Sequence, residues 1–138
     1  LDIESRLNKF KDRIKQFPRV SRDKYFENIS RVDINLAPLE LNNPFCESKS
    51  ELKFFEAGIV GVPTVAVKNK TFSEAIEDGI DGFLAGNTEE WVGKLEKLIT
   101  DENLRREMGQ RARENSLQNY TNKNSHNEEY YNYLRSRL

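Results

Sequence analysis

Short uncharged segments alternate with amphipathic segments along this chain. Residues 32–36 alternate apolar and polar side chains, which is typical of a β-strand. Residues 63–67 (PTVAV) carry no charge and include β-branched side chains, which predicts an interior strand covered on both faces. Apolar residues at 14–17, ahead of Pro18, predict a further strand. The short apolar run at Phe83 follows two turn signals and is expected to add a hairpin-like edge.

Helical periodicity separates these strands. Apolar side chains recur every three or four positions between residues 50 and 60, and Gly61 and Pro63 then stop the helix. Ser50 or Ser48 is expected to be its N-cap. Further helices are predicted over residues 1–13, 21–30, 71–77, 89–99, 101–118 and 128–138.

The alternation of strands and helices predicts an α/β fold with a parallel sheet and helices on both faces. Three strands are few for an independent doubly wound domain, and the chain begins with Leu1 rather than Met. We therefore expect a piece of a longer protein. Residues 1–118 would form an incomplete α/β domain, and residues 119–138 a polar segment ending in a helix.

Composition and charge exclude several classes of protein. The 138 residues include 22 Lys and Arg against 23 Asp and Glu, a net charge of −1, which argues against a nucleic-acid module built on phosphate neutralisation. A single cysteine, Cys46, excludes an intramolecular disulfide and a cysteine-built zinc site. A single histidine, His126, removes most histidine-based metal and catalytic schemes. We expect no metal site.

No membrane span or export signal is predicted. The longest nearly uncharged stretch, residues 57–67, is too short to cross a bilayer and is broken by glycine and proline. The first residues lack the charged and apolar regions of a signal peptide. A cytoplasmic location is therefore expected.

Four sequence pieces occur in a fixed order between residues 33 and 84. They are LAP at 36–38, KS at 49–50, FEA with GVP at 55–57 and 61–63, and IEDGIDGFL at 76–84. Together they resemble the donor-binding domain of GT-B glycosyltransferases, the large retaining family that includes sucrose-phosphate and bacterial polysaccharide enzymes. The resemblance extends more weakly over nearly the whole chain. It implies the partial Rossmann-like C-terminal domain of an enzyme that moves a sugar from a nucleoside diphosphate to an acceptor hydroxyl, with retention of configuration and no metal or other cofactor.

Glu56 matches the second glutamate of the family's E-x7-E signature, which implies that it accepts hydrogen bonds from the ribose hydroxyls of the donor. A carboxylate can accept from two adjacent hydroxyls, although without the motif a solvated helix glutamate is the simpler interpretation. The first glutamate of the signature would fall at Ser48. Glu47 stands one residue out of register and is a candidate to reach the donor sugar from the loop.

Lys49 and Ser50 stand where a loop meets a helix start, a natural phosphate site because backbone N–H groups are free there. The resemblance implies contact with the donor diphosphate, and the alternative is a plain cap with a solvated lysine. Arg19 and Val20 belong to the segment FPRV, whose counterpart in the family contacts the nucleotide base through backbone atoms. An ordinary surface loop is the alternative here.

The expected partners are a nucleotide sugar and an acceptor glycan or lipid-linked glycan, and the acceptor would be bound by an N-terminal domain outside this chain. A peripheral position at the inner face of a membrane is the alternative to a free cytoplasmic location. No catalytic residue can be named. Open α/β sheets bind ligands at the carboxyl ends of their strands, so we expect Glu56, residues 49–50 and Arg19 to converge there. The alternative is a non-catalytic regulatory or interaction module that keeps the fold without binding a donor. Ser48, in place of glutamate, favours that alternative.

Overall fold

A three-stranded parallel sheet forms the centre of the protein. The computed structural model describes residues 7–124 and 127–137. The strands are β1 (Asn35–Ala37), β2 (Thr64–Val67) and β3 (Phe83–Ala85), and they pair in the order β1-β2-β3. All four residues of β2 are buried, which confirms the interior strand at 63–67.

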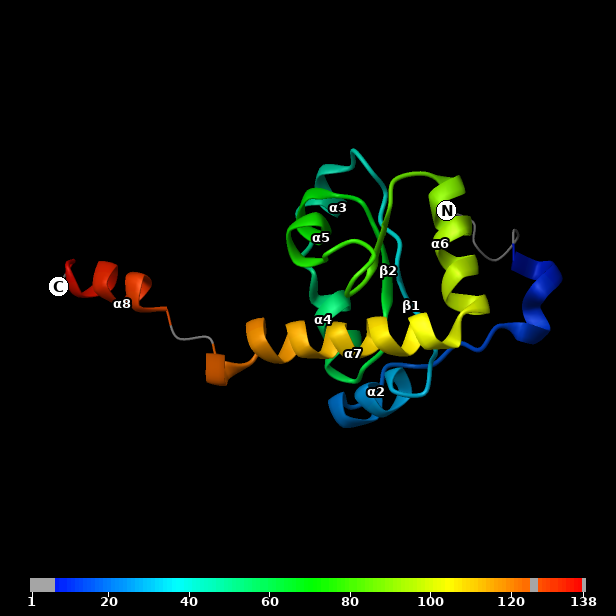
Figure 1. Cartoon of the computed structure of the whole chain (residues 1–138), viewed down its shortest axis with the longest axis horizontal. Coiled ribbons are helices and arrows are strands. Elements are labelled where there is room, and N and C mark those ends of the chain that lie inside the picture. Colours follow the sequence, from blue (N-terminus) through cyan, green and yellow to red (C-terminus); the bar gives the residue numbers. More distant parts are fainter. Residues whose placement is uncertain (1–6, 125–126, 138) are drawn as a thin grey trace.

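Helices cover the sheet on both faces, as predicted, and Figure 1 shows their arrangement. The long helix α7 crosses α4 beside the sheet, α6 lies along β3, and α8 extends away from the sheet at the carboxyl end. The helices are α2 (Arg22–Ile29), α3 (Pro44–Glu47), α4 (Leu52–Ile59), α5 (Lys70–Ala75), α6 (Thr88–Thr100), α7 (Glu102–Asn119) and α8 (Glu128–Arg135), with 3-10 turns η1 (Asn8–Arg13) and η2 (Asn122–Asn124).

The side chains of β3 supply both halves of the core. Phe83 packs with Leu98 of α6 on one face of the sheet, whereas Leu84 packs with Phe54 of α4 and Phe72 of α5 on the other. This two-sided burial is typical of a parallel sheet and explains why its strands carry no charge.

Two glycines allow α7 to pack closely against α4 and against the turn that follows α4. A Cβ atom placed on Gly58 of α4 would lie 2.8 Å from the carbonyl oxygen of Ala112 and closer still to Ser116 Oγ. A Cβ atom on Gly109 of α7 would lie 3.0 Å from the carbonyl carbon of Gly61 and closer still to its oxygen. This close packing therefore requires the absence of side chains at these positions.

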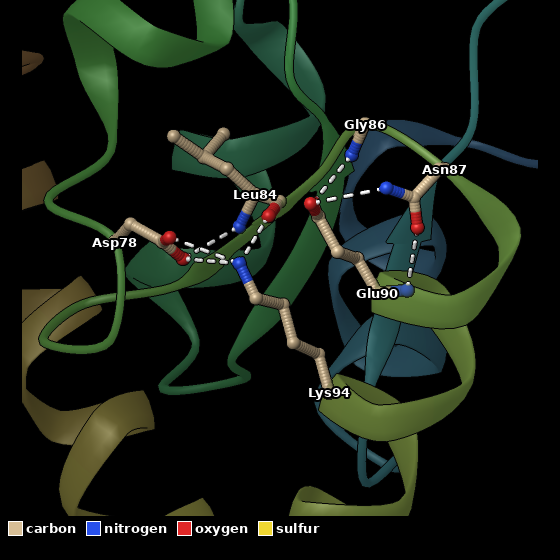
Figure 2. A network of polar contacts seen from close by, with 6 residues as sticks. All are labelled: Asp78, Leu84, Gly86, Asn87, Glu90 and Lys94. Carbon is tan, nitrogen blue, oxygen red and sulfur yellow. Dashed lines mark hydrogen bonds and ion pairs between the residues drawn. The ribbon is translucent and has the colours of Figure 1, made fainter.

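A polar network fixes α6 against β3 and the turn before it (Figure 2). Asp78 accepts the backbone N–H of Leu84 at 2.9 Å and the Lys94 ammonium at 2.9 and 3.0 Å, and Lys94 also donates to the Leu84 carbonyl. Asn87 is the N-cap of α6, because its side chain accepts the Glu90 N–H at 2.9 Å. The IEDGIDGFL turn thus has a structural role in this chain.

The structure corrects the expected strands. Residues 14–17 form no strand, and the exposed side chains of Ile14 (41%) and Phe17 (69%) bury too little surface to hold them on the sheet. The third strand is β3, which pairs parallel to β2 rather than forming a hairpin edge. A parallel return is possible because α5 lies between the two strands and carries the chain back.

Part of the predicted N-terminal amphipathic helix is present, but as a 3-10 helix that buries no side chain. Residues 8–13 form the 3-10 turn η1 with no buried residue, and residues 1–6 lie outside the described part of the chain. The predicted helices at 21–30, 50–60, 71–77, 89–99 and 101–118 are confirmed, each within about two residues.

Candidate functional site

An open cleft of about 870 Å³ lies between the extended segment 17–20, helix α2, strand β1 and helix α4. Its volume falls within the range of about 300–1,000 Å³ that is usual for small-molecule sites. The walls are mostly apolar, with a few polar groups between them. The cleft is lined by Phe17, Pro18, Arg19, Val20, Arg22, Tyr25, Asn28, Ile29, Val32, Ile34, Asn35, Leu36 and Glu56.

Glu56 projects from α4 into this cleft, where it meets a tyrosine from α2. The phenol of Tyr25 donates a hydrogen bond of 2.8 Å to Glu56 Oε2. Burial raises the pKa of Tyr25 to about 12, and the bond to the Glu56 carboxylate adds to the shift. Tyr25 is therefore a neutral donor across the working range of an ordinary protein.

Asn35 orients α4 from the neighbouring strand. Its side-chain amide donates to the carbonyl of Lys53 and to Thr64 Oγ1, both at 3.0 Å. One amide thus joins β1, β2 and the second residue of α4, one turn before Glu56. This contact fixes the helix face that looks into the cleft.

A smaller pocket of about 170 Å³ lies at the carboxyl end of β1. Its lining includes Lys49 and Ser50, together with Lys53 of α4 and Phe72 of α5. Leu36 lines both this pocket and the larger cleft, so the two are neighbours.

The start of α4 differs from the predicted cap. The N-cap position is Glu51, and no side chain caps the helix. Ser48 instead ends α3, and its hydroxyl donates to the Phe45 carbonyl at 2.9 Å. The proline and the Asn43 cap at the start of α3 fold residues 44–47 into a separate helix, which removes Ser48 from α4.

The structure therefore brings together part of the expected site. Arg19, Val20 and Glu56 line the cleft, while Lys49 and Ser50 line the adjoining pocket. Glu47 at the end of α3 and Ser48 after it line neither of the two. The cleft also runs along β1 and the residues before it, rather than lying only beyond its carboxyl end.

Tyr25 and Asn35 were missed by sequence reasoning. Tyr25 belongs to the apolar face of the helix predicted at 21–30, and Asn35 takes a polar position in an alternating strand, so neither residue stands out in the sequence. The signal that could have found Tyr25 is a polar group on an otherwise apolar helix face, since a half-buried phenol needs a hydrogen-bond partner.

Other chemical groups add nothing to this site. Cys46 is a half-buried free thiol in α3, and His126 lies outside the described residues. Among the described residues, no three His, Cys, Asp or Glu side chains gather as metal ligands. None of the described helices is both long and apolar enough to cross a membrane.

Comparison with known proteins gave one family and one fold. Residues 5–128 match the family described as glycosyl transferase-like. A similar solved structure is the C-terminal domain of a glycosyl transferase group 1 family protein, LpcC, from Francisella tularensis, with 20% identity and a TM-score of 0.62. The match covers 88% of this chain and 64% of that one, so this chain spans less than two thirds of that structure. No curated protein matched.

Proposed function

This chain belongs to the glycosyl transferase-like family, and we propose that the full-length protein transfers a sugar from a nucleoside-diphosphate sugar to an acceptor hydroxyl. In this proposal, the present chain binds the donor. The observation that carries the proposal is the shared cleft. Glu56, the candidate ribose ligand, and the segment with Arg19 and Val20, the candidate base-binding loop, line the same cavity although they are far apart in sequence.

Under this proposal the cleft holds the nucleoside. Its apolar walls suit a base, and the Glu56 carboxylate suits the vicinal hydroxyls of a ribose. A carboxylate offers about four acceptor positions, and Tyr25 uses one of them. The positions that remain are enough for two ribose hydroxyls.

The adjoining pocket holds the diphosphate. Lys49 lines this pocket and supplies positive charge, and α4 begins beside it without a side-chain cap. The N–H groups of Leu52 and Lys53 are therefore available to an anion, whereas that of Phe54 donates to the Glu51 carbonyl. Donors fixed in this way stabilise the charge that develops on the leaving diphosphate. Glu56 anchors the nucleoside and moves no proton.

The acceptor is bound by parts of the protein outside this chain, and we propose a glycan or lipid-linked glycan for that role. Transfer depends on holding donor and acceptor in one geometry, an effect that reaches about 7–11 kcal/mol. Residues 1–138 alone are therefore expected to transfer no sugar. Retention of configuration and the absence of a cofactor remain predictions from the family resemblance.

The test is a calorimetric titration of the full-length protein with UDP, GDP and ADP, followed by the corresponding nucleotide sugars. One nucleotide is expected to bind, and Glu56→Ala is expected to weaken its binding. A folded protein that binds none of the three would overturn the proposal and favour the non-catalytic module. Ser48 ends α3 and donates its hydroxyl to the Phe45 carbonyl. This role is compatible both with a glycosyltransferase and with a non-catalytic module.

A further inference from the structure

We propose that Tyr25 is a positioning residue of the donor site, which holds the Glu56 carboxylate in the orientation that the ribose hydroxyls require. The inference rests on the proposed function and adds a residue to it. Its basis is the contact between two helices across the cleft, because the Tyr25 hydroxyl lies 2.8 Å from Glu56 Oε2.

Glutamate needs such support because its side chain has three rotatable bonds. Fixing a side chain of this kind costs conformational entropy. When the protein itself makes the fixing contact, the ligand no longer meets that cost on binding. Tyr25 therefore prepares the carboxylate before the nucleotide arrives.

Tyr25 is itself well fixed. Its ring packs edge-on against Phe26 with centroids 5.6 Å apart, and the residue lies in the first turn of α2, whose N-cap is Ser21. Residues 17–20 come directly before that cap and line the same cleft. The bond from Tyr25 to Glu56 thus joins α2, the helix that follows the candidate base-binding segment, to α4.

The chemical type of the donor also fits this role. A lysine or arginine beside Glu56 would neutralise the carboxylate and weaken it as an acceptor. A neutral phenol fixes one oxygen and leaves the negative charge in place, and hydrogen bonds to a charged acceptor are about twice as strong as neutral ones. The contact therefore orients Glu56 and preserves its capacity to bind hydroxyls.

The experiment compares Tyr25→Phe, Glu56→Ala and the double variant in the full-length protein, with whichever of UDP, GDP and ADP binds the wild type most tightly. Tyr25→Phe keeps the ring and is expected to raise the nucleotide Kd and the donor KM about threefold to tenfold, with kcat changed less than about twofold. In the Glu56→Ala background the same change is expected to have no effect on the Kd. Tyr133→Phe, which removes an exposed phenol from α8, is the matched control.

Each other outcome has a defined meaning. If Glu56→Ala weakens binding but Tyr25→Phe does not, this inference fails while the proposed function stands. If Tyr25→Phe is equally harmful with and without Glu56, the tyrosine does not act through the carboxylate. A Tyr25→Phe protein that no longer folds would assign the hydroxyl to stability and overturn the proposal. A wild type that binds none of the nucleotides overturns the proposed function and this inference with it.

Discussion

Replacing Gly109 by alanine tests the close packing of α7 against the turn between α4 and β2. In an open helix this change stabilises by about 1 kcal/mol, because alanine has the higher helix propensity. Here the new methyl group would lie 3.0 Å from the carbonyl carbon of Gly61, closer to its oxygen, and 3.2 Å from Pro63 Cδ. Overpacking of this kind costs about 1–3 kcal/mol. The opposing atoms belong to the backbone and to a proline ring, which cannot rotate away, so the upper part of that range applies.

We therefore expect Gly109→Ala to lower the free energy of unfolding by about 1–2 kcal/mol net. For a chain of this size that corresponds to a fall in Tm of roughly 3–10 °C. The measurement is thermal and urea unfolding followed by circular dichroism, with the same buffer and protein concentration for every variant.

Gly93 of α6 provides the matched control, since nothing lies within 4 Å of the position that its Cβ would occupy. Gly93→Ala is expected to raise the free energy of unfolding by up to about 1 kcal/mol. The same substitution should thus act in opposite directions in two helices. A Gly109→Ala protein at least as stable as the wild type would refute the argument that α7 is in steric contact with the turn after α4 at this point.

Three further predictions concern single side chains. Glu56→Ala is expected to weaken nucleotide binding by about 1–3 kcal/mol, with an unchanged circular dichroism spectrum. If calorimetry gives an unaltered Kd, Glu56 is an ordinary helix residue and not a ligand of the nucleotide. The free energy of unfolding is expected to fall as pH rises from about 10 to about 12. Tyrosines of the unfolded chain lose their protons near pH 10.0, whereas Tyr25 and Tyr120 of the folded protein have pKa values raised to about 12. Urea unfolding at stepped pH should show a smaller fall for Tyr25→Phe. Lys94→Met is expected to lower the free energy of unfolding in urea by about 1–2 kcal/mol, because it breaks the contacts of Lys94 with Asp78 and Leu84 that fix α6. The control Lys97→Met, on the exposed side of α6, should change this free energy little.

Local sequence signals were sufficient to predict most helices, including α4, and the central strand β2. The uncharged run at 63–67 identified β2, and Gly61 with Pro63 marked the end of α4. These features depend on neighbouring residues, which a sequence shows directly. The family and the parallel sheet are also confirmed.

Features that depend on distant contacts could not be predicted. The run FLA at 83–85 has the same appearance in a hairpin and in a parallel strand, and only its pairing with β2 decides between them. Residues 14–17 have the composition of a strand, yet they pair with no strand of the sheet. Ser48 fits a capping box for α4, but Pro44 starts a competing helix that takes the serine as its end.

The candidate site followed the same rule. The motif around Glu56 and the segment at 19–20 could be named from the sequence, and their placement in one cleft required the fold. Tyr25 has no motif of its own, because its relation to Glu56 spans 31 positions of the chain. Whether these residues bind a nucleotide sugar remains a prediction for the titrations described above.

Under the proposed function, the contact of Gly58 with α7 also indicates where engineering of donor preference should begin. Gly58 lies two residues after Glu56 on the same short helix, and its backbone rests against α7. Any side chain added at Gly58 would collide with Ala112 and Ser116 of α7 and destabilise the fold. Residues 17–20 line the same cleft and belong to no helix or strand, so directed evolution has room to vary their length and composition. A library confined to that segment, with α4 held constant, is the efficient route to variants that accept a different nucleotide.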